Sequence, residues 1–212
     1  MRALVLALQA HTFSLPTYRA KPAKAPRLRS IRIVGMAQPI DLARVTAEAR
    51  ATNLARWLTS QPPNKLTMLS SQEALQALSK EQGWQAKFFD VAALTKPGAG
   101  AFLAVAQGHR TPGAGIMRLR YRPAGTSARA RPQVALVGKC IIFDTGGTNL
   151  KPFKAMLDMH HDMAGSAVAV ATMLTLSELR VPFAVDCWLA ITENRISGDA
   201  YKSRDIVSAS NG

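Results

Sequence analysis

The chain has 212 residues, 48% of them hydrophobic, and its formal net charge at pH 7 is +14. This length is enough for a packed core in one or two domains, and no apolar run reaches the roughly 18–20 residues that a membrane-spanning helix needs. The two cysteines, Cys140 and Cys187, exclude a disulfide-rich scaffold and favour reduced thiols in a cytoplasmic protein.

The positive charge is unevenly distributed. Residues 1–50 contain nine Lys or Arg against Asp41 and Glu48, so this segment carries +7, half of the total. A second basic cluster has no acid among its members: Arg118, Arg120, Arg122, Arg129 and Arg131. Such patches can bind nucleic acid through its phosphates. We favour solvated faces, or surfaces whose acidic partner is absent.

The N-terminal part is divided from the rest near residue 41. The short apolar stretch at residues 1–10 is interpreted as a strand or helix of the fold, because a signal peptide needs a longer apolar region. Residues 11–39 are rich in proline and basic residues, and residues 31–33 indicate one strand. We interpret residues 1–41 as a linker or the remnant of an N-terminal domain, and residues 42–212 as the main domain.

Two helices and three strands are predicted next. Asp41 can cap a helix that runs to about residue 60, where Pro62 and Pro63 end it. The pair Ser70 and Glu73 has the spacing of a capping box for a second helix, which would close at residue 83. Strand patterns follow at residues 84–89, 101–106 and 116–121, and the last of these alternates apolar and basic side chains.

The second half of the domain predicts the fold class. Residues 134–137 and 141–143 are short apolar runs typical of buried strands, residues 164–179 form an Ala-rich helical stretch, and residues 183–192 are another buried strand. This strand–helix–strand order predicts an α/β fold with a mainly parallel sheet and helices on both sides.

Polar residues gather where these buried strands end. They are Lys139, Asp144, Lys151, Asp158, His160, His161 and Asp162. Ligands of open α/β sheets bind beyond the carboxyl ends of the strands, and two carboxylates with a lysine could hold a divalent ion there. The alternative is structural: Asp144 would belong to a capped turn and Asp162 would cap the following helix.

The literal sequence around these residues resembles one family. Residues 137–147 (VGKCIIFDTGG) resemble VGKGxTFDTGG, the signature of the leucyl aminopeptidases. Further segments resemble motifs of that family in the same order: NLAR at 53–56, PPNKLT at 62–67, AVAQG at 104–108, NLKP at 149–152, MHHDMAGSA at 159–167 and ENRISGDAYKSRD at 193–205. The resemblance covers about residues 42–212.

The resemblance implies a function and a role for each site residue. The family consists of peptide hydrolases that use two divalent ions, Mn²⁺ or Zn²⁺, to release the N-terminal amino acid of a peptide, and its members form hexamers in the cytoplasm. By resemblance, Lys139 would bind one metal as a neutral amine, Asp144 would bridge both metals and Asp162 would share the metal of Lys139. Lys151 would remain cationic and stabilise the oxyanion.

Three departures from the family pattern affect this interpretation. The family's later segment NTDAEGR, which carries an aspartate, a glutamate and an arginine of the site, is absent, so the chain is expected to be truncated and weakly active or inactive. Cys140 replaces a glycine, and we interpret it as a buried inert thiol rather than a metal ligand. His160 and His161 are interpreted as helix-entry residues, one of them exposed, although imidazoles can also bind zinc.

Two alternatives to an aminopeptidase remain. The basic N-terminal segment could bind nucleic acid, although no helix-turn-helix, zinc finger or aromatic RNA-binding motif is visible. The chain could also be a non-catalytic protein that docks onto full-length subunits. We expect any DNA binding to be unspecific and to weaken as salt rises.

Overall fold

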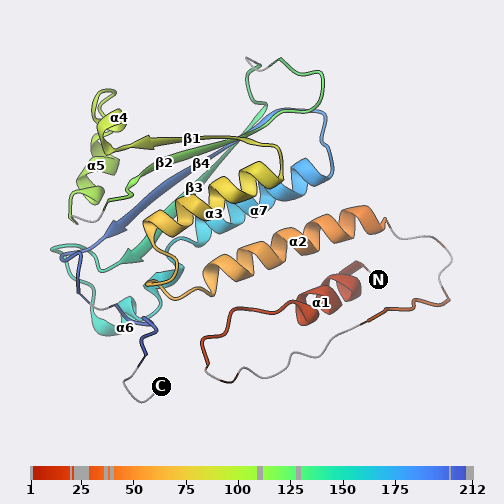
Figure 1. Cartoon of the computed structure of the whole chain (residues 1–212), viewed down its shortest axis with the longest axis horizontal. Helices are drawn as coiled ribbons and strands as arrows, with labels where there is room; N and C mark the ends of the chain where they lie inside the picture. The colour runs from red at the N-terminus through yellow and green to blue at the C-terminus, as the bar shows by residue number, and fades with distance from the viewer. Residues whose placement is uncertain are drawn as a thin grey trace.

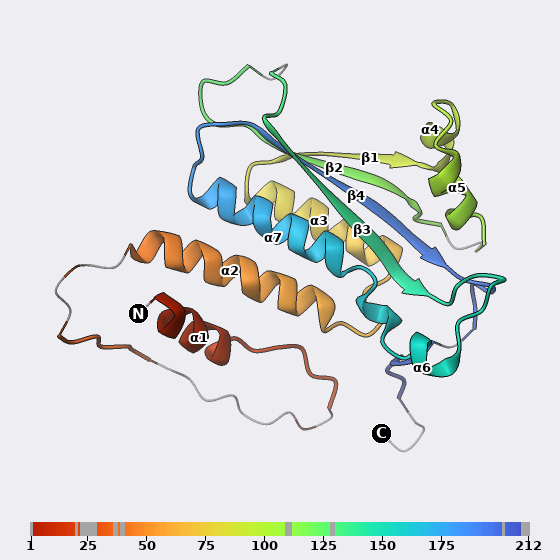
Figure 2. The same cartoon turned by 180° about the vertical axis from the view of Figure 1, so that it is seen from behind.

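The structure is a computed structural model that describes residues 2–19, 21, 29–35, 38, 41–108, 112–127, 130–200 and 202–208. The chain forms one four-stranded sheet. Figures 1 and 2 show that this sheet is twisted and that long helices are layered on one of its faces. Arg129 and Tyr201, which belong to the basic cluster and to a family-like motif, lie outside the described residues. Within the described residues, no helix is both long and apolar enough to cross a membrane.

The first helix, α1 (Arg2–Thr12), lies alongside α2 (Leu42–Thr59). The Arg56 guanidinium on α2 donates a 2.8 Å hydrogen bond to the carbonyl of Ala10, which ties the two helices together. The described part of the following segment, residues 29–35, has no regular structure, so the prediction of a strand at residues 31–33 is wrong. Two alternating apolar residues bury too little surface to hold an isolated strand. The division near residue 41 stays a prediction.

The two predicted helices form, with one change at a cap. Asp41 caps α2, and its carboxylate accepts a 3.1 Å hydrogen bond from the Arg44 N–H, as predicted. The second helix, α3 (Met68–Glu81), is capped instead by Thr67, whose hydroxyl and backbone N–H form a reciprocal capping box with Ser70. The hydroxyl of a threonine satisfies the first free N–H groups in the same way as the predicted serine would.

One predicted strand is a helix. The strand β1 (Gln85–Asp90) is followed by two short helices, α4 (Val91–Thr95) and α5 (Gly100–Ala106), and α5 occupies the segment predicted as a strand. A short apolar run does not distinguish a strand from a helix, and the alanines of this segment favour the helix.

The sheet contains three further strands: β2 (Gly115–Tyr121), β3 (Val134–Asp144) and β4 (Val185–Asn194). Their order is β1-β2-β4-β3, with β3 parallel to β4 and the other two pairs antiparallel. The α/β class is therefore confirmed, but the sheet is mixed rather than mainly parallel. The alternating burial of β2 is typical of an antiparallel strand with one solvated face, and only β3 and β4 are joined by a long helix.

The core lies on one face of the sheet. Met117, Leu119, Cys187, Leu189 and Ile191 are fully buried, and they belong to the same cluster as residues of α3 and of α7 (Ala164–Glu178). The helix α2 packs against α7, so the three long helices lie on the same side of the sheet (Figures 1 and 2). In the described part of the chain no long helix covers the other face, which corrects the prediction of helices on both sides.

Candidate functional site

A bulge in β3 places two of the predicted site residues on the same face of the sheet. Lys139 pairs with Ala190 of β4, and Asp144 pairs with Asn194. Asp144 is five positions after Lys139, but their partners are only four positions apart, because β3 contains one extra residue between Ile141 and Asp144. Side chains alternate along a strand, so without this extra residue Lys139 and Asp144 would point to opposite faces.

A glycine turn brings the chain back toward Asp144. Gly146 has a φ of 92°, and a Cβ atom there would lie 2.3 Å from the carbonyl oxygen of Asn149. Only glycine accepts both this conformation and this close approach. The backbone N–H of Lys151 then donates a 2.9 Å hydrogen bond to the carbonyl of Thr145. The turn therefore places the Lys151 side chain beside Asp144.

Both oxygens of Asp144 are hydrogen-bonded. Its Oδ1 accepts from the Gly146 N–H at 2.8 Å and from the Asn194 amide at 2.7 Å, while Oδ2 accepts from the Lys151 ammonium. Burial by itself would raise the pKa of Asp144, but the hydrogen bonds from Lys151, Gly146 and Asn194 outweigh it and hold the pKa below its ordinary value. The carboxylate is therefore ionised and fixed in orientation.

Asp162 forms the second lysine–carboxylate pair. It follows a short 3₁₀ turn, η1 (Met159–His161), and precedes α7. Its Oδ1 accepts a 2.8 Å hydrogen bond from the Lys139 ammonium, whereas its Oδ2 is buried and has no hydrogen-bond partner among the described residues. An unpartnered buried carboxylate oxygen is costly and is a natural position for a cation.

Met159 contacts both pairs. Its sulfur accepts a hydrogen bond from the Lys151 ammonium at 3.5 Å, and its carbonyl accepts one from the backbone N–H of Asp162 at 3.2 Å. Met159 is therefore a common neighbour of both pairs. Asp144 lies at the carboxyl end of β3, but Lys139 lies in the middle of that strand, which corrects the prediction that Lys139 follows a strand end. That all four side chains serve one metal pair stays a prediction.

The histidines form no ligand cluster. His160 is buried and His161 is exposed, as predicted for helix-entry residues. Burial and the nearby His161 and Arg204 lower the pKa of His160 to about 4, so its ring is neutral near pH 7. Within the described ranges no group of three or more His, Cys, Asp or Glu side chains could hold a metal ion.

The cysteine of the motif is a core residue. Cys140 is buried, and burial raises the pKa of its thiol to about 11. A protonated thiol is a poor metal ligand. The predicted burial of Cys140 is confirmed, and its lack of a role as metal ligand stays a prediction.

Two residues that support the site were not singled out from the sequence. Asn194 holds the Asp144 carboxylate, and Arg195 forms a buried ion pair with Glu193 at 3.0 Å. Arg195 also donates to the carbonyls of Gly198 and Ala200, so it fixes the chain that follows β4. Three consecutive polar residues, Glu193, Asn194 and Arg195, at the end of a buried apolar strand were the available signal. The Glu193 carboxylate is thus paired with Arg195.

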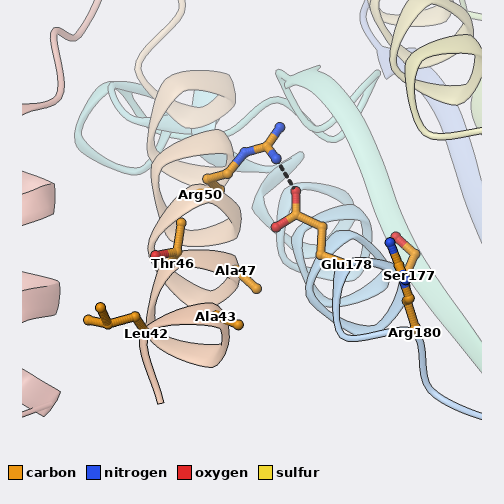
Figure 3. A pocket seen from close by; sticks show the side chains of 8 residues that line it. All are labelled: Leu42, Ala43, Thr46, Ala47, Arg50, Ser177, Glu178 and Arg180. Carbon is orange, nitrogen blue, oxygen red and sulfur yellow. Dashed lines mark ion pairs between the residues drawn. The ribbon is translucent and has the colours of Figure 1, made fainter. Parts of the chain in front are cut away.

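A separate pocket lies between α2 and α7, away from these residues (Figure 3). Its volume is about 590 Å³, and the 2.5 Å ion pair between Arg50 and Glu178 crosses it. Its lining consists of Leu42, Ala43, Thr46, Ala47, Arg50, Ser177, Glu178 and Arg180. None of the predicted site residues is among them, so this pocket is not the predicted site.

Comparison with known proteins identifies relatives of most of the chain. The model of the cytosol aminopeptidase family, catalytic domain, matches residues 53–212. A probable cytosol aminopeptidase of Leifsonia xyli is 32% identical over 203 residues, which are 95% of this chain and 40% of that protein. The chain thus spans about 40% of the length of this curated relative.

Solved structures with a similar fold include a leucyl aminopeptidase and a related maturation enzyme. The leucyl aminopeptidase of Trypanosoma cruzi has a TM-score of 0.67 and 32% identity, covering 77% of this chain and 31% of that one. The bottromycin maturation enzyme BotP in complex with Mn has a TM-score of 0.76 and 29% identity, covering 93% of this chain and 40% of that one.

Proposed function

Because the chain belongs to the cytosol aminopeptidase family, we propose that Lys139, Asp144, Lys151 and Asp162 are its part of a two-metal site for hydrolysis of the N-terminal residue of peptides. The observation that carries this proposal is the pair of lysine–carboxylate contacts, Lys151 with Asp144 at the end of β3 and Lys139 with Asp162, which share Met159 as a neighbour. We also propose, from family membership, a leucine-type substrate, a cytoplasmic location and assembly into hexamers.

The donor atoms present suit a hard divalent cation. Asp144 and Asp162 supply carboxylate oxygens, and the buried Oδ2 of Asp162 has no hydrogen-bond partner in the part of the chain that the structure describes. Lys139 would join them as a neutral amine. Bound Mn²⁺ or Zn²⁺ would hold the free amino group of the peptide and lower the pKa of a water. The manganese bound by the relative BotP supports this choice of metals.

Lysine ammonium groups now neutralise both carboxylates. A cation must displace Lys151 from Asp144 and Lys139 from Asp162 before it can bind. Lys139 must also lose its proton to act as a ligand, so metal binding should release a proton and strengthen as pH rises. Released from Asp144, the ammonium of Lys151 would be free to stabilise the oxyanion of the transition state.

The described residues fall short of a complete ligand set. Two carboxylates offset two of the four positive charges that a pair of divalent ions brings, and no further acid or histidine joins them within the described ranges. A site with so few anionic ligands binds metal weakly. We therefore propose that this chain by itself hydrolyses leucyl substrates poorly or not at all.

The test is hydrolysis of a leucine anilide with millimolar Mn²⁺, by this chain and by a chimaera that carries the following segment of the Leifsonia xyli relative. We expect strong activation in the chimaera and its loss in the chimaera's Asp144→Asn and Asp162→Asn variants. Arg204→Ala, which removes an exposed ion pair, serves as the control. Equal turnover by the chain and the chimaera would show that the residues present suffice.

A non-catalytic role on full-length subunits is the second candidate. It draws on the same family membership, because an incomplete catalytic domain can retain its contact surfaces. Light scattering of this chain mixed with a full-length relative would detect such an assembly.

A further inference from the structure

The amide of Asn194 is held in one orientation beside the Asp144 carboxylate. Asn194 is half-buried at the end of β4, and strand pairing places it directly opposite Asp144 of β3. Its Nδ2 donates a 2.7 Å hydrogen bond to Oδ1 of Asp144. Its own Oδ1 lies against Gly147, where an added Cβ atom would be 3.0 Å away. An ionised carboxylate can only accept hydrogen bonds, so the amide must present its nitrogen to Asp144.

The backbone of Asn194 is tied to the glycine turn separately from its side chain. The Asn194 carbonyl accepts hydrogen bonds from the backbone N–H of Thr145 at 2.9 Å and from the Thr145 hydroxyl at 3.0 Å. The Thr145 hydroxyl in turn accepts a 3.3 Å hydrogen bond from the Gly147 N–H. These contacts do not involve the amide of residue 194. The amide therefore has a contact with Asp144 that is separable from the closure of the turn.

The two oxygens of Asp144 have different kinds of partner. Oδ1 accepts from the Asn194 amide and from the Gly146 N–H at 2.8 Å, so both of its acceptor positions are used by uncharged donors. Oδ2 accepts from the Lys151 ammonium. A cation that displaces Lys151 would therefore meet a carboxylate whose other oxygen is still held by two donors. Hydrogen bonds of this kind orient metal ligands and strengthen metal binding.

We propose that Asn194 is a positioning residue of the metal site, which fixes the rotation of the Asp144 carboxylate before a cation binds. This inference rests on the proposed metal site and adds a residue to it. Without the amide, the Gly146 N–H is the donor that remains on Oδ1, and a single hydrogen bond allows the carboxylate to rotate about its Cβ–Cγ bond. Metal binding would then have to stop this rotation, which costs conformational entropy and lowers the affinity.

The first measurement needs no metal. Asn194→Leu keeps a side chain of similar size but has no donor, and Asn64→Leu is the matched control, because the Asn64 amide bonds the backbone of Ile206 instead of a carboxylate. NMR would follow the exchange of individual backbone N–H groups with solvent. The Gly146 N–H loses a fixed acceptor in Asn194→Leu and should exchange about tenfold faster. The Thr145 N–H, which is bonded to the Asn194 carbonyl, should keep its rate.

The second measurement is the binding of Mn²⁺ alone, read from the electron paramagnetic resonance signal of free Mn²⁺ at millimolar metal. Loss of a residue that orients a metal ligand lowers metal affinity by about 10–100-fold. We expect a loss in this range for Asn194→Leu and no loss for Asn64→Leu. Neither measurement depends on substrate hydrolysis.

The outcomes separate this inference from the proposed function. Faster exchange at Gly146 alone, together with weaker Mn²⁺ binding by Asn194→Leu, would support it. An unchanged rate at Gly146 would overturn it, and so would faster exchange at both Gly146 and Thr145, because the amide would then hold the strand end rather than the carboxylate. Equal Mn²⁺ affinity of Asn194→Leu and the unchanged chain would overturn it and leave the metal site standing.

Two further cases are covered. Absence of Mn²⁺ binding by the unchanged chain would refute the metal site itself, and this inference with it. If Asn194→Leu does not fold, Asn194→Asp keeps the shape of the amide without its donor. Asn194→Asp should then show the same faster exchange at Gly146, and an unchanged rate there would overturn the proposal.

Discussion

The buried ion pair after β4 gives the sharpest test of the structure. The side chains of Arg195 and Glu193 are 4% and 5% exposed, and Arg195 also holds two backbone carbonyls. Arg195→Ala would leave the Glu193 carboxylate buried without its partner. Breaking a buried pair in this way costs about 3–5 kcal/mol.

The corresponding loss of thermal stability is large. A chain of this size loses about 2–4 °C in Tm per kcal/mol, so Arg195→Ala should lower Tm by about 6–20 °C. Circular dichroism during heating and urea unfolding would measure it. Arg204→Ala is the matched control, because its pair with Asp158 is exposed on both sides and is worth about 0–1 kcal/mol. A similar effect of both substitutions would refute the assignment of a stabilising role to the buried pair.

Three further predictions follow from close packing, burial and charge. A Cβ atom at Gly138 would lie 2.6 Å from the backbone of α7, so Gly138→Ala should cost about 1–3 kcal/mol in urea unfolding, whereas Gly100→Ala, which meets open space, should cost nothing. Burial raises the thiol pKa to about 11 for Cys140 and to about 12 for Cys187, so a thiol reagent at pH 8 should label neither cysteine in the folded chain and both in urea; labelling of the folded chain would contradict the packing. The pKa of Asp144 in the folded chain is lowered, so the ionised carboxylate stabilises the fold at neutral pH, and this stabilisation is lost as the pH falls through the folded pKa. Asp144→Asn should therefore unfold at a lower urea concentration than the unchanged chain at pH 7. The difference between the two urea midpoints should shrink below about pH 4.

The sequence predicted those parts of the fold that depend on local pattern. Asp41 capping α2, the alternation along β2 and the long apolar helix α7 are local features, and all three are confirmed. The helix at 100–106 was mistaken for a strand because a short apolar run fits either structure. Strand direction was mistaken because β1 pairs through tertiary contacts that no local pattern reports.

The residues of the candidate site were likewise predicted only where a local motif marks them. The motif indicated Lys139, Asp144, Lys151 and Asp162, and the structure pairs them two by two. The role of Asn194 was not predicted, because its amide reaches Asp144 only through the pairing of β3 with β4. Contacts between residues fifty positions apart depend on register, and register is a property of the whole sheet.

The extra residue in β3 limits how this segment can change in evolution. Deleting one residue between Ile141 and Asp144 would remove the bulge and turn Asp144 toward the helices, although every amino acid of the motif would still be present. Inserting one residue would do the same. Substitutions that keep the count of residues leave the carboxylate on the side of Lys139. Selection on this segment therefore acts on its length as strictly as on its chemistry, and related chains should tolerate varied apolar residues there but no single-residue gaps.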